Sequence, residues 1–111
     1  MARVLRGEIY WADLEPVVGH EQGGRRPVVI ISHDPFNHHS ATVIAMAITS
    51  RLQRAGYPLT WPIPAGILPR PSWVKIAQVR TLAVERLTER LGTVEERDVQ
   101  ELVEGLVQLI G

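Results

Sequence analysis

Short apolar runs separated by turn-forming residues dominate this chain, and a helical pattern of apolar residues is confined to its C-terminal end. Runs of about four to eight apolar, β-branched or aromatic residues bounded by glycine, proline or polar residues are typical of strands. The runs of this kind cover residues 7–14, 27–32, 41–49, 57–63, 72–82 and 87–91. Short strands at this spacing, followed by one helix, predict a mainly β fold of the α+β type, a small antiparallel barrel.

Three of these segments carry further information about their place in the fold. Residues 57–63 contain Pro58 and Pro62, which cannot donate to a central ladder, so this strand is expected at an edge of the sheet. Residues 72–82 alternate imperfectly and predict one bent strand or two short ones. Residues 33–40 are polar and are expected to form a loop or a short turn of helix.

The C-terminal helix is predicted from its caps and its periodicity. Residues 93–96 have the composition of a capping box, with Thr93 as the expected capping residue. The apolar residues that follow recur every three or four positions, which is typical of a helix with one buried face. They are Val99, Leu102, Val103, Leu106, Val107 and Ile110.

The length and composition predict a single domain spanning residues 1–111. The chain has no cysteine, which excludes disulfides and thiolate zinc sites. No apolar run is long enough to span a bilayer and the first residues do not resemble a signal segment, so a soluble, cytoplasmic protein is expected.

The net charge is zero, but the charges are unevenly distributed. Residues 1–84 carry nine basic and five acidic side chains, whereas residues 85–111 carry three and seven. All the basic residues except Lys75 are arginine, whose planar fork matches phosphate oxygens. A near-neutral domain argues against indiscriminate coating of DNA, and it permits a local phosphate site.

The segment GHEQGGRRPVVIIS, residues 19–32, places a flexible, charged half directly before a rigid, apolar half. Glycines allow the first half to move, and Pro27 with the following strand anchors Arg26. An arginine held in this way can present its planar fork to a phosphate group.

Three ordered motifs resemble the MazF/PemK family of toxin endoribonucleases. Residues 7–32 resemble the family's opening, a glycine at the first strand followed by Glu-Gln-x-x-x-Arg-Pro and an apolar second strand. AITS at 47–50 resembles the threonine-bearing end of the third strand, and AQVRTLAVERL at 77–87 resembles the Gln-x-Arg-Thr segment. The opening pattern falls on Gly7, Glu21, Gln22, Arg26 and Pro27.

The resemblance implies an SH3-like barrel of the MazF/CcdB type and a homodimer. It implies sequence-selective cleavage of single-stranded RNA without a metal ion or other cofactor, leaving 2′,3′-cyclic phosphate and 5′-hydroxyl ends. It also implies an antitoxin partner, whose binding segment we expect to be acidic and flexible because basic side chains flank the expected site.

The matching positions imply a catalytic set of Arg26, Thr49 and Glu21. Arg26 suits charge stabilisation and is a poor base, because arginine stays protonated in proteins. Glu21 is the more natural proton acceptor if its loop raises its pKa. Thr49 can donate a hydrogen bond to a phosphate oxygen. The residues expected to bind RNA are Gln22, Arg25, Ser50, Arg51, Gln78 and Arg80.

Other interpretations remain open at the level of sequence. Glu21 could simply neutralise an arginine of its loop. The histidines at 33, 38 and 39 with Asp34 lack a firm ligand spacing, so no metal site is expected. The barrel also resembles the CcdB toxins, which inhibit DNA gyrase by contact, and an inactive RNA-binding relative would carry the same residues.

Overall fold

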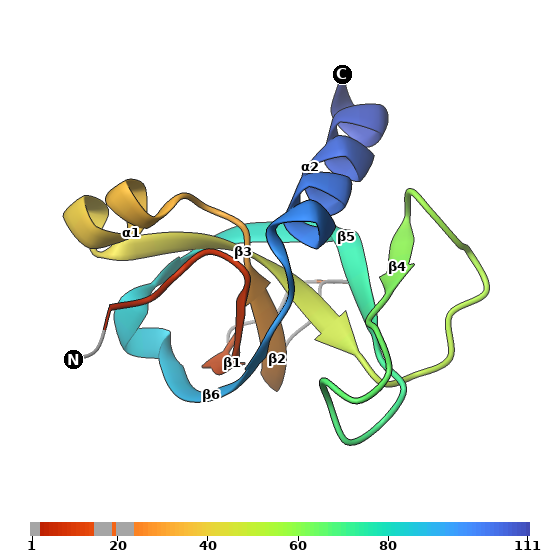
Figure 1. Cartoon of the computed structure of the whole chain (residues 1–111), viewed down its shortest axis with the longest axis horizontal. Helices are drawn as coiled ribbons and strands as arrows, with labels where there is room; N and C mark the ends of the chain where they lie inside the picture. Colours follow the sequence, from red (N-terminus) through yellow and green to blue (C-terminus); the bar gives the residue numbers. More distant parts are fainter. Residues whose placement is uncertain (1–2, 15–18, 20–23) are drawn as a thin grey trace.

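The computed structural model describes residues 3–14, 19 and 24–111, and these form a curved antiparallel sheet with a long helix lying across it (Figure 1). The strands are β1 (Glu8–Asp13), β2 (Arg25–Ile30), β3 (Thr42–Thr49), β4 (Thr60–Pro62), β5 (Trp73–Ala83) and β6 (Leu87–Thr93). The helices are α1 (Asp34–Ser40), the 3₁₀ turn η1 (Val84–Arg86) and α2 (Glu96–Ile110). The predicted strands and the terminal helix are therefore confirmed, and residues 33–40 contain a short helix.

The strands are ordered β4-β5-β3-β2-β1-β6 in a single sheet. Within the described part of the chain no pairing joins β4 to β6, so the expected SH3-like barrel is present but open. The proline-containing strand β4 lies at an edge, as predicted.

The prediction of a bent strand for residues 72–82 is confirmed, because β5 is continuous and its register shifts against β3. Two steps along β3, from Met46 to Ile48, correspond to five steps along β5, from Val79 to Val74. The extra residues of β5 bulge out of the ladder, which bends the strand. This bend allows one half of β5 to pair with β4 while the other half continues toward η1.

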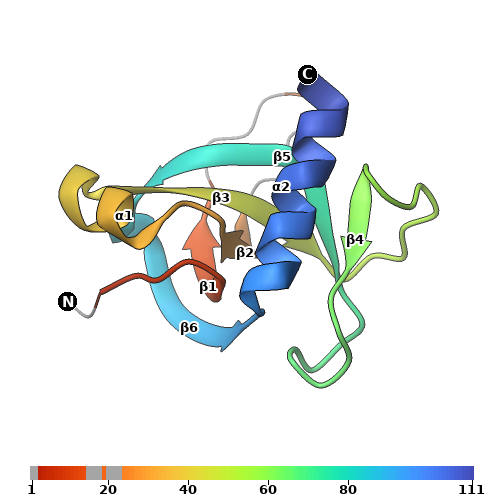
Figure 2. The ribbon, with the colours of Figure 1, turned by 45° about the horizontal axis from the view of Figure 1, so that its top comes forward.

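Alternation along the strands gives the sheet two buried faces. On one face lies what we call the strand core, formed by Val4, Tyr10, Ala12, Leu14, Val28, Ile30, Val43, Ala45, Ala47, Leu82 and Leu87. On the other face lies what we call the helix core, formed by Ile9, Val29, Ile31, Met46, Ile48, Trp61, Ile63, Val74, Ile76, Val94, Val99 and Leu102. Helix α2 covers this second face, as Figure 2 shows.

The predicted cap of the C-terminal helix is wrong in its position. Thr93 is the last residue of β6, where it pairs with Glu8 and its hydroxyl donates to the carbonyl oxygen of Gly7 at 3.3 Å. The capping residue is Glu95, which forms a reciprocal capping box with Asp98. Pairing with β1 keeps Thr93 in the sheet, and the helix begins later than its composition suggests.

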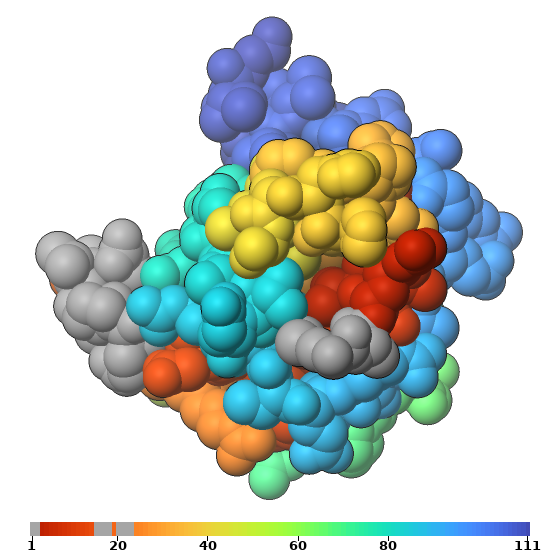
Figure 3. Space-filling model, turned by 90° about the vertical axis from the view of Figure 1, so that its left-hand side faces the viewer, coloured from red at the N-terminus to blue at the C-terminus, as the bar shows by residue number. Residues whose placement is uncertain are grey.

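Helix α1 closes one end of the sheet between the N-terminal segment and the β5–β6 connection (Figure 3). Its buried Asn37 side chain donates to the carbonyl oxygens of Val4 at 3.3 Å and Ser32 at 3.1 Å. These bonds hold the N-terminal segment against the sheet. No helix in the described ranges is both long and apolar enough to cross a membrane.

Candidate active site

The start of β2, with Arg26, and the end of β3, with Thr49, lie at the same rim of the sheet because the two strands are antiparallel neighbours. Antiparallel pairing matches Val28 with Ala47 and Ile30 with Ala45. The paired residues end at Val28 and Ala47, and Arg26 and Thr49 each lie two residues beyond this last pair, at the same end of the two strands. The pairing of two apolar strands therefore directs the two predicted catalytic residues, which are distant in sequence, toward the same end of the β2–β3 pair.

Both residues belong to the strand-core face of the sheet. Arg26 follows the alternation of Val28 and Ile30, and Thr49 follows that of Ala45 and Ala47. Arg26 is exposed at the rim, while the strand directly beyond Pro27 is fully buried. The guanidinium thus projects from a backbone that is fixed by pairing and packing on both sides.

The hydroxyl of Thr49 is held in place by its surroundings. Thr49 is only 6% exposed and pairs with Trp73 of β5. Its Oγ1 accepts a hydrogen bond from the backbone N–H of Arg51 at 3.1 Å. This bond uses the oxygen as an acceptor, so the hydroxyl hydrogen can be donated to a phosphate oxygen.

Arg80 lies on β5 on the same face as Arg26 and Thr49, because it alternates with Leu82 and pairs with Ala45, whereas Gln78 lies in the bulged part of the strand. Arg80 is half-buried and its Nη1 donates to the carbonyl oxygen of Leu14 at 3.3 Å. The backbone N–H of Leu14 donates in turn to Gly24 at 2.9 Å, directly before β2. Arg80 is thus tied to the start of β2, and residues 77–81 line a cavity of about 370 Å³.

Arg25 lies on the opposite face from Arg26, since successive residues of a strand alternate. Its guanidinium stacks over the ring of Trp11, 5.2 Å from the centroid, and its Nη2 lies 3.4 Å from Thr88 Oγ1. Ser50 shares this face and lines a second cavity with Pro27. Arg25 and Arg26 therefore lie on opposite faces of the sheet at this rim.

The remaining predicted site residues are placed only in part. Arg51 is exposed beside Thr49, and its carbonyl oxygen accepts a bond from Gln53 Nε2 at 2.9 Å. Glu21 and Gln22 fall outside the described residues. Among the described residues, no group of three or more His, Asp or Glu side chains is arranged to hold a metal ion.

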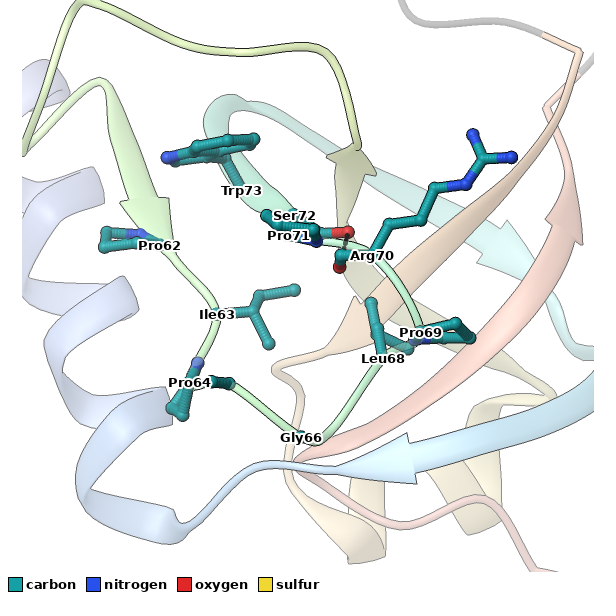
Figure 4. A pocket seen from close by; sticks show the side chains of 11 residues that line it. Pro62, Ile63, Pro64, Gly66, Leu68, Pro69, Arg70, Pro71, Ser72 and Trp73 are labelled. Carbon is teal, nitrogen blue, oxygen red and sulfur yellow. Dashed lines mark hydrogen bonds between the residues drawn. The ribbon is translucent and has the colours of Figure 1, made fainter.

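The proline-rich connection between β4 and β5 borders the rim, and none of its residues was among the predicted site residues. Leu68, Pro69, Arg70 and Ser72 of this connection line two neighbouring cavities. One, of about 270 Å³, lies within the connection itself; in Figure 4 the Arg70 side chain points away from it. The other faces β1 and β2. The segment lacks any periodic pattern, so Arg70 was its one sequence signal for a place near a site.

The fold and the rim together define a class, a small open β-barrel with a C-terminal helix that carries an arginine and a threonine at the adjacent ends of two paired strands. Comparison with known proteins agrees with this description. The model of the family described as "PemK-like, MazF-like toxin of type II toxin-antitoxin system" matches residues 5–110. The chain belongs to this family.

Individual relatives support the same assignment. Endoribonuclease EndoA of Bacillus subtilis is 40% identical over 105 residues, covering 93% of this chain and 90% of EndoA. A crystal structure of MazF from Deinococcus radiodurans has a TM-score of 0.86 at 28% identity, covering all of this chain and 99% of that one. MazF in a MazE–MazF complex from the same organism has a TM-score of 0.78 at 25% identity, with coverage of 100% and 98%. The predicted family is confirmed, and the predicted enzyme class agrees with these comparisons.

Proposed function

We propose that this chain is a sequence-selective endoribonuclease toxin that cleaves single-stranded RNA, including mRNA, by attack of the RNA's own 2′-hydroxyl. The products are a 2′,3′-cyclic phosphate and a 5′-hydroxyl, and no metal takes part. The observation that supports the proposal is the antiparallel pairing of β2 with β3, whose adjacent ends carry Arg26 and Thr49 at one rim of the sheet. Cleavage of mRNA places this activity in the cytoplasm.

Each residue has a role that follows from its chemistry. Arg26 stabilises the charge that develops on the phosphorane, and Thr49 donates a hydrogen bond to one of its oxygens. Glu21 takes the proton of the attacking hydroxyl. Arg25, Arg51, Gln78 and Arg80, with Gln22 and Ser50, bind the flanking RNA.

Cleavage of RNA should persist in excess EDTA. The proposed chemistry needs a cation, a hydrogen-bond donor and a base, and side chains supply all three. Purified protein is incubated with a mixed-sequence RNA, and both ends of each fragment are mapped and chemically identified. Protein carrying Arg26→Ala, purified in parallel, controls for contaminating nucleases. Loss of activity on chelation, with recovery on adding one divalent ion, would contradict the metal-free mechanism.

A homodimer is the second part of the proposal, and an unpaired apolar surface on α2 supports it. The C-terminal half of α2 projects beyond the sheet (Figure 1) and exposes Val107 and Ile110, at 53% and 76%. The adjoining Tyr57 hydroxyl donates to the carbonyl oxygen of Glu101 at 2.7 Å. Burial, with a smaller contribution from Glu104, raises the pKa of Tyr57 and keeps it a donor. The tyrosine therefore extends this surface beyond the helix.

Sedimentation velocity should show a dimer at micromolar concentration and a monomer for Val107→Asp. A charge placed in an apolar interface is desolvated without a partner, which is strongly unfavourable. Phe36→Asp is the matched control, because Phe36 is an exposed apolar residue on α1, which is a different part of the surface. A monomeric wild type, or a Val107→Asp protein that dimerises normally, would contradict the proposal.

An antitoxin is the expected protein partner, since structures of relatives include toxin–antitoxin complexes. We expect its binding segment to be acidic and flexible, with apolar anchors, because Arg25, Arg26, Arg51 and Arg54 are exposed at or near the rim. Such a segment would compete with RNA for the same cations and wrap the surface as it folds.

The association rate of the antitoxin should fall as salt is raised, because screening shortens the reach of surface charges to about 8–10 Å near physiological ionic strength. Stopped-flow fluorescence at several salt concentrations measures this rate. Competition by a non-cleavable single-stranded RNA is measured in the same instrument. A rate independent of salt, together with no competition, would indicate apolar docking away from the site.

A further inference from the structure

A cavity of about 230 Å³ opens on the opposite side of the rim from Arg26 and Thr49. Its lining comes from four parts of the chain: β1, β2, the end of β3 with the connection before β5, and β6. The residues are Trp11, Pro27, Ser50, Leu68, Pro69, Arg70, Ser72 and Leu91. We propose that this cavity binds one unstacked nucleobase of the RNA close to the cleaved bond and so sets part of the sequence selectivity, an inference that rests on the proposed function.

The position of the cavity relative to the catalytic pair supports this assignment. Pro27 directly follows Arg26 and Ser50 directly follows Thr49, so each catalytic residue has a cavity-lining neighbour. Because neighbours on a strand face opposite sides, the cavity and the catalytic pair lie back to back across the ends of β2 and β3. An RNA strand that passes over these strand ends with a phosphate at Arg26 brings an adjacent base to the cavity.

The size and lining of the cavity suit a single flat ring system. Drug-sized ligands occupy pockets of about 300–1,000 Å³, and this cavity, at about 230 Å³, is of a size to accommodate a single base. Trp11, Leu68 and Leu91 supply apolar surface for the faces of a base. Ser50 and Ser72 contribute hydroxyl groups; Ser72 already donates to the carbonyl oxygen of Arg70 at 3.0 Å. Apolar walls with a few polar groups match the faces and the edge of a base.

Charge complementarity favours RNA as the occupant over an uncharged ligand. Arg25 stacks on the Trp11 ring that forms one wall, and the exposed Arg70 forms part of another. Together with Arg26 they place cations on both faces of the rim. The RNA backbone has a phosphate on each side of the nucleotide whose base is bound, and these phosphates can contact the cations. Only a single strand can use the cavity, because a base within a duplex is stacked and paired.

The test combines base removal in the RNA with filling of the cavity in the protein. A short RNA containing the preferred cleavage site is made with an abasic nucleotide at each position in turn. The wild type should cleave it about 10-fold more slowly when one particular base near the bond is absent, which is the scale of a lost stacking or pocket contact. Leu68→Trp, which fills the cavity, should cleave intact RNA slowly by a similar factor. It should show no further loss when that same base is absent.

One control variant and one further cavity variant separate an effect on the cavity from general damage. Leu5→Trp adds the same bulk at an exposed leucine outside the cavity and should keep the wild-type abasic profile. Arg70→Gln changes an exposed side chain, so it preserves the fold, and it should weaken the dependence on that base. If an abasic nucleotide slows cleavage by Leu68→Trp and by Arg70→Gln as much as it slows cleavage by the wild type, at every position, the cavity does not hold a base.

A binding measurement distinguishes failure of this inference from failure of the proposed function. Non-cleavable 2′-O-methyl RNA carrying 2-aminopurine at the sensitive position, or at each position in turn, should show a fluorescence change on binding. Leu68→Trp should abolish this change. A wild type that gives it but cleaves no RNA would refute the nuclease and leave the base site standing. Normal cleavage with an unchanged signal in Leu68→Trp, or a variant defective only in antitoxin binding, would overturn the base site.

Discussion

Replacement of Arg26 by alanine is expected to slow RNA cleavage by about 100- to 1,000-fold, the usual loss when one preorganised transition-state donor is removed. The guanidinium lies at the exposed rim, so the substitution should leave the fold intact. Single-turnover cleavage of an RNA containing one site measures the chemical step. Circular dichroism and thermal unfolding of the same sample establish that the protein is folded.

Two further variants sharpen the interpretation of this result. Arg26→Lys keeps the charge and loses the bidentate fork, so its activity should remain well below that of the wild type. Thr49→Ala should cost less than Arg26→Ala, because hydrogen bonds from neutral donors contribute less than those from charged groups. Near-full activity of Arg26→Ala with the same products would remove this residue from the site. Full toxicity of cleavage-dead Arg26→Ala in cells would favour a toxin of the gyrase-binding type.

Replacement of Gly7 by alanine is expected to have the largest effect on stability. Gly7 has φ of +92°, and a Cβ there would lie 2.8 Å from the backbone carbonyl oxygen of Val94. The residue cannot move away, because its N–H donates to Ile30 at 2.7 Å and its carbonyl accepts from Val94 at 2.8 Å. Backbone strain and steric overlap each cost about 1–3 kcal/mol, so a loss of about 3–5 kcal/mol in the free energy of unfolding is expected.

Gly66→Ala is the matched control for this prediction. Gly66 has nearly the same φ, +93°, and a Cβ there would meet no atom within 4 Å. Its substitution should cost only the strain of the left-handed backbone, about 1–2 kcal/mol. Urea denaturation of the two variants measures both losses. Equal losses would show that contact with Val94 is not what requires glycine at position 7.

The sequence alone determined the strands and the chemistry of the rim. Runs such as 27–32 and 41–49 are apolar and β-branched, and such residues have few alternatives to a buried strand. The prolines of 57–63 restricted that segment to an edge for a local reason, the missing N–H. Arg26 followed by Pro27 is likewise a local signal, because it joins a cation to an anchored strand.

Local signals failed where the tertiary structure supplied a competing partner. Thr93 has the composition of a helix cap, but pairing with Glu8 and the bond to Gly7 keep it in β6. The bulge in β5 could not be located from sequence, because it arises from mismatched pairing with two neighbouring strands. Composition predicts which segments form strands, but it does not predict the register in which those strands pair.

The site therefore has two origins. Sequence specified the arginine and the threonine of the proposed site, together with the arginine-rich character of the first 84 residues. Only the antiparallel pairing of β2 with β3 set the strand ends that carry Arg26 and Thr49 at the same rim, and only the three-dimensional structure placed Arg25 over the Trp11 ring. The cavity beside Pro27 and Ser50 likewise exists only in three dimensions, because four separate parts of the chain build its walls. Such contacts depend on pairing between distant segments, and the local order of residues does not encode that pairing.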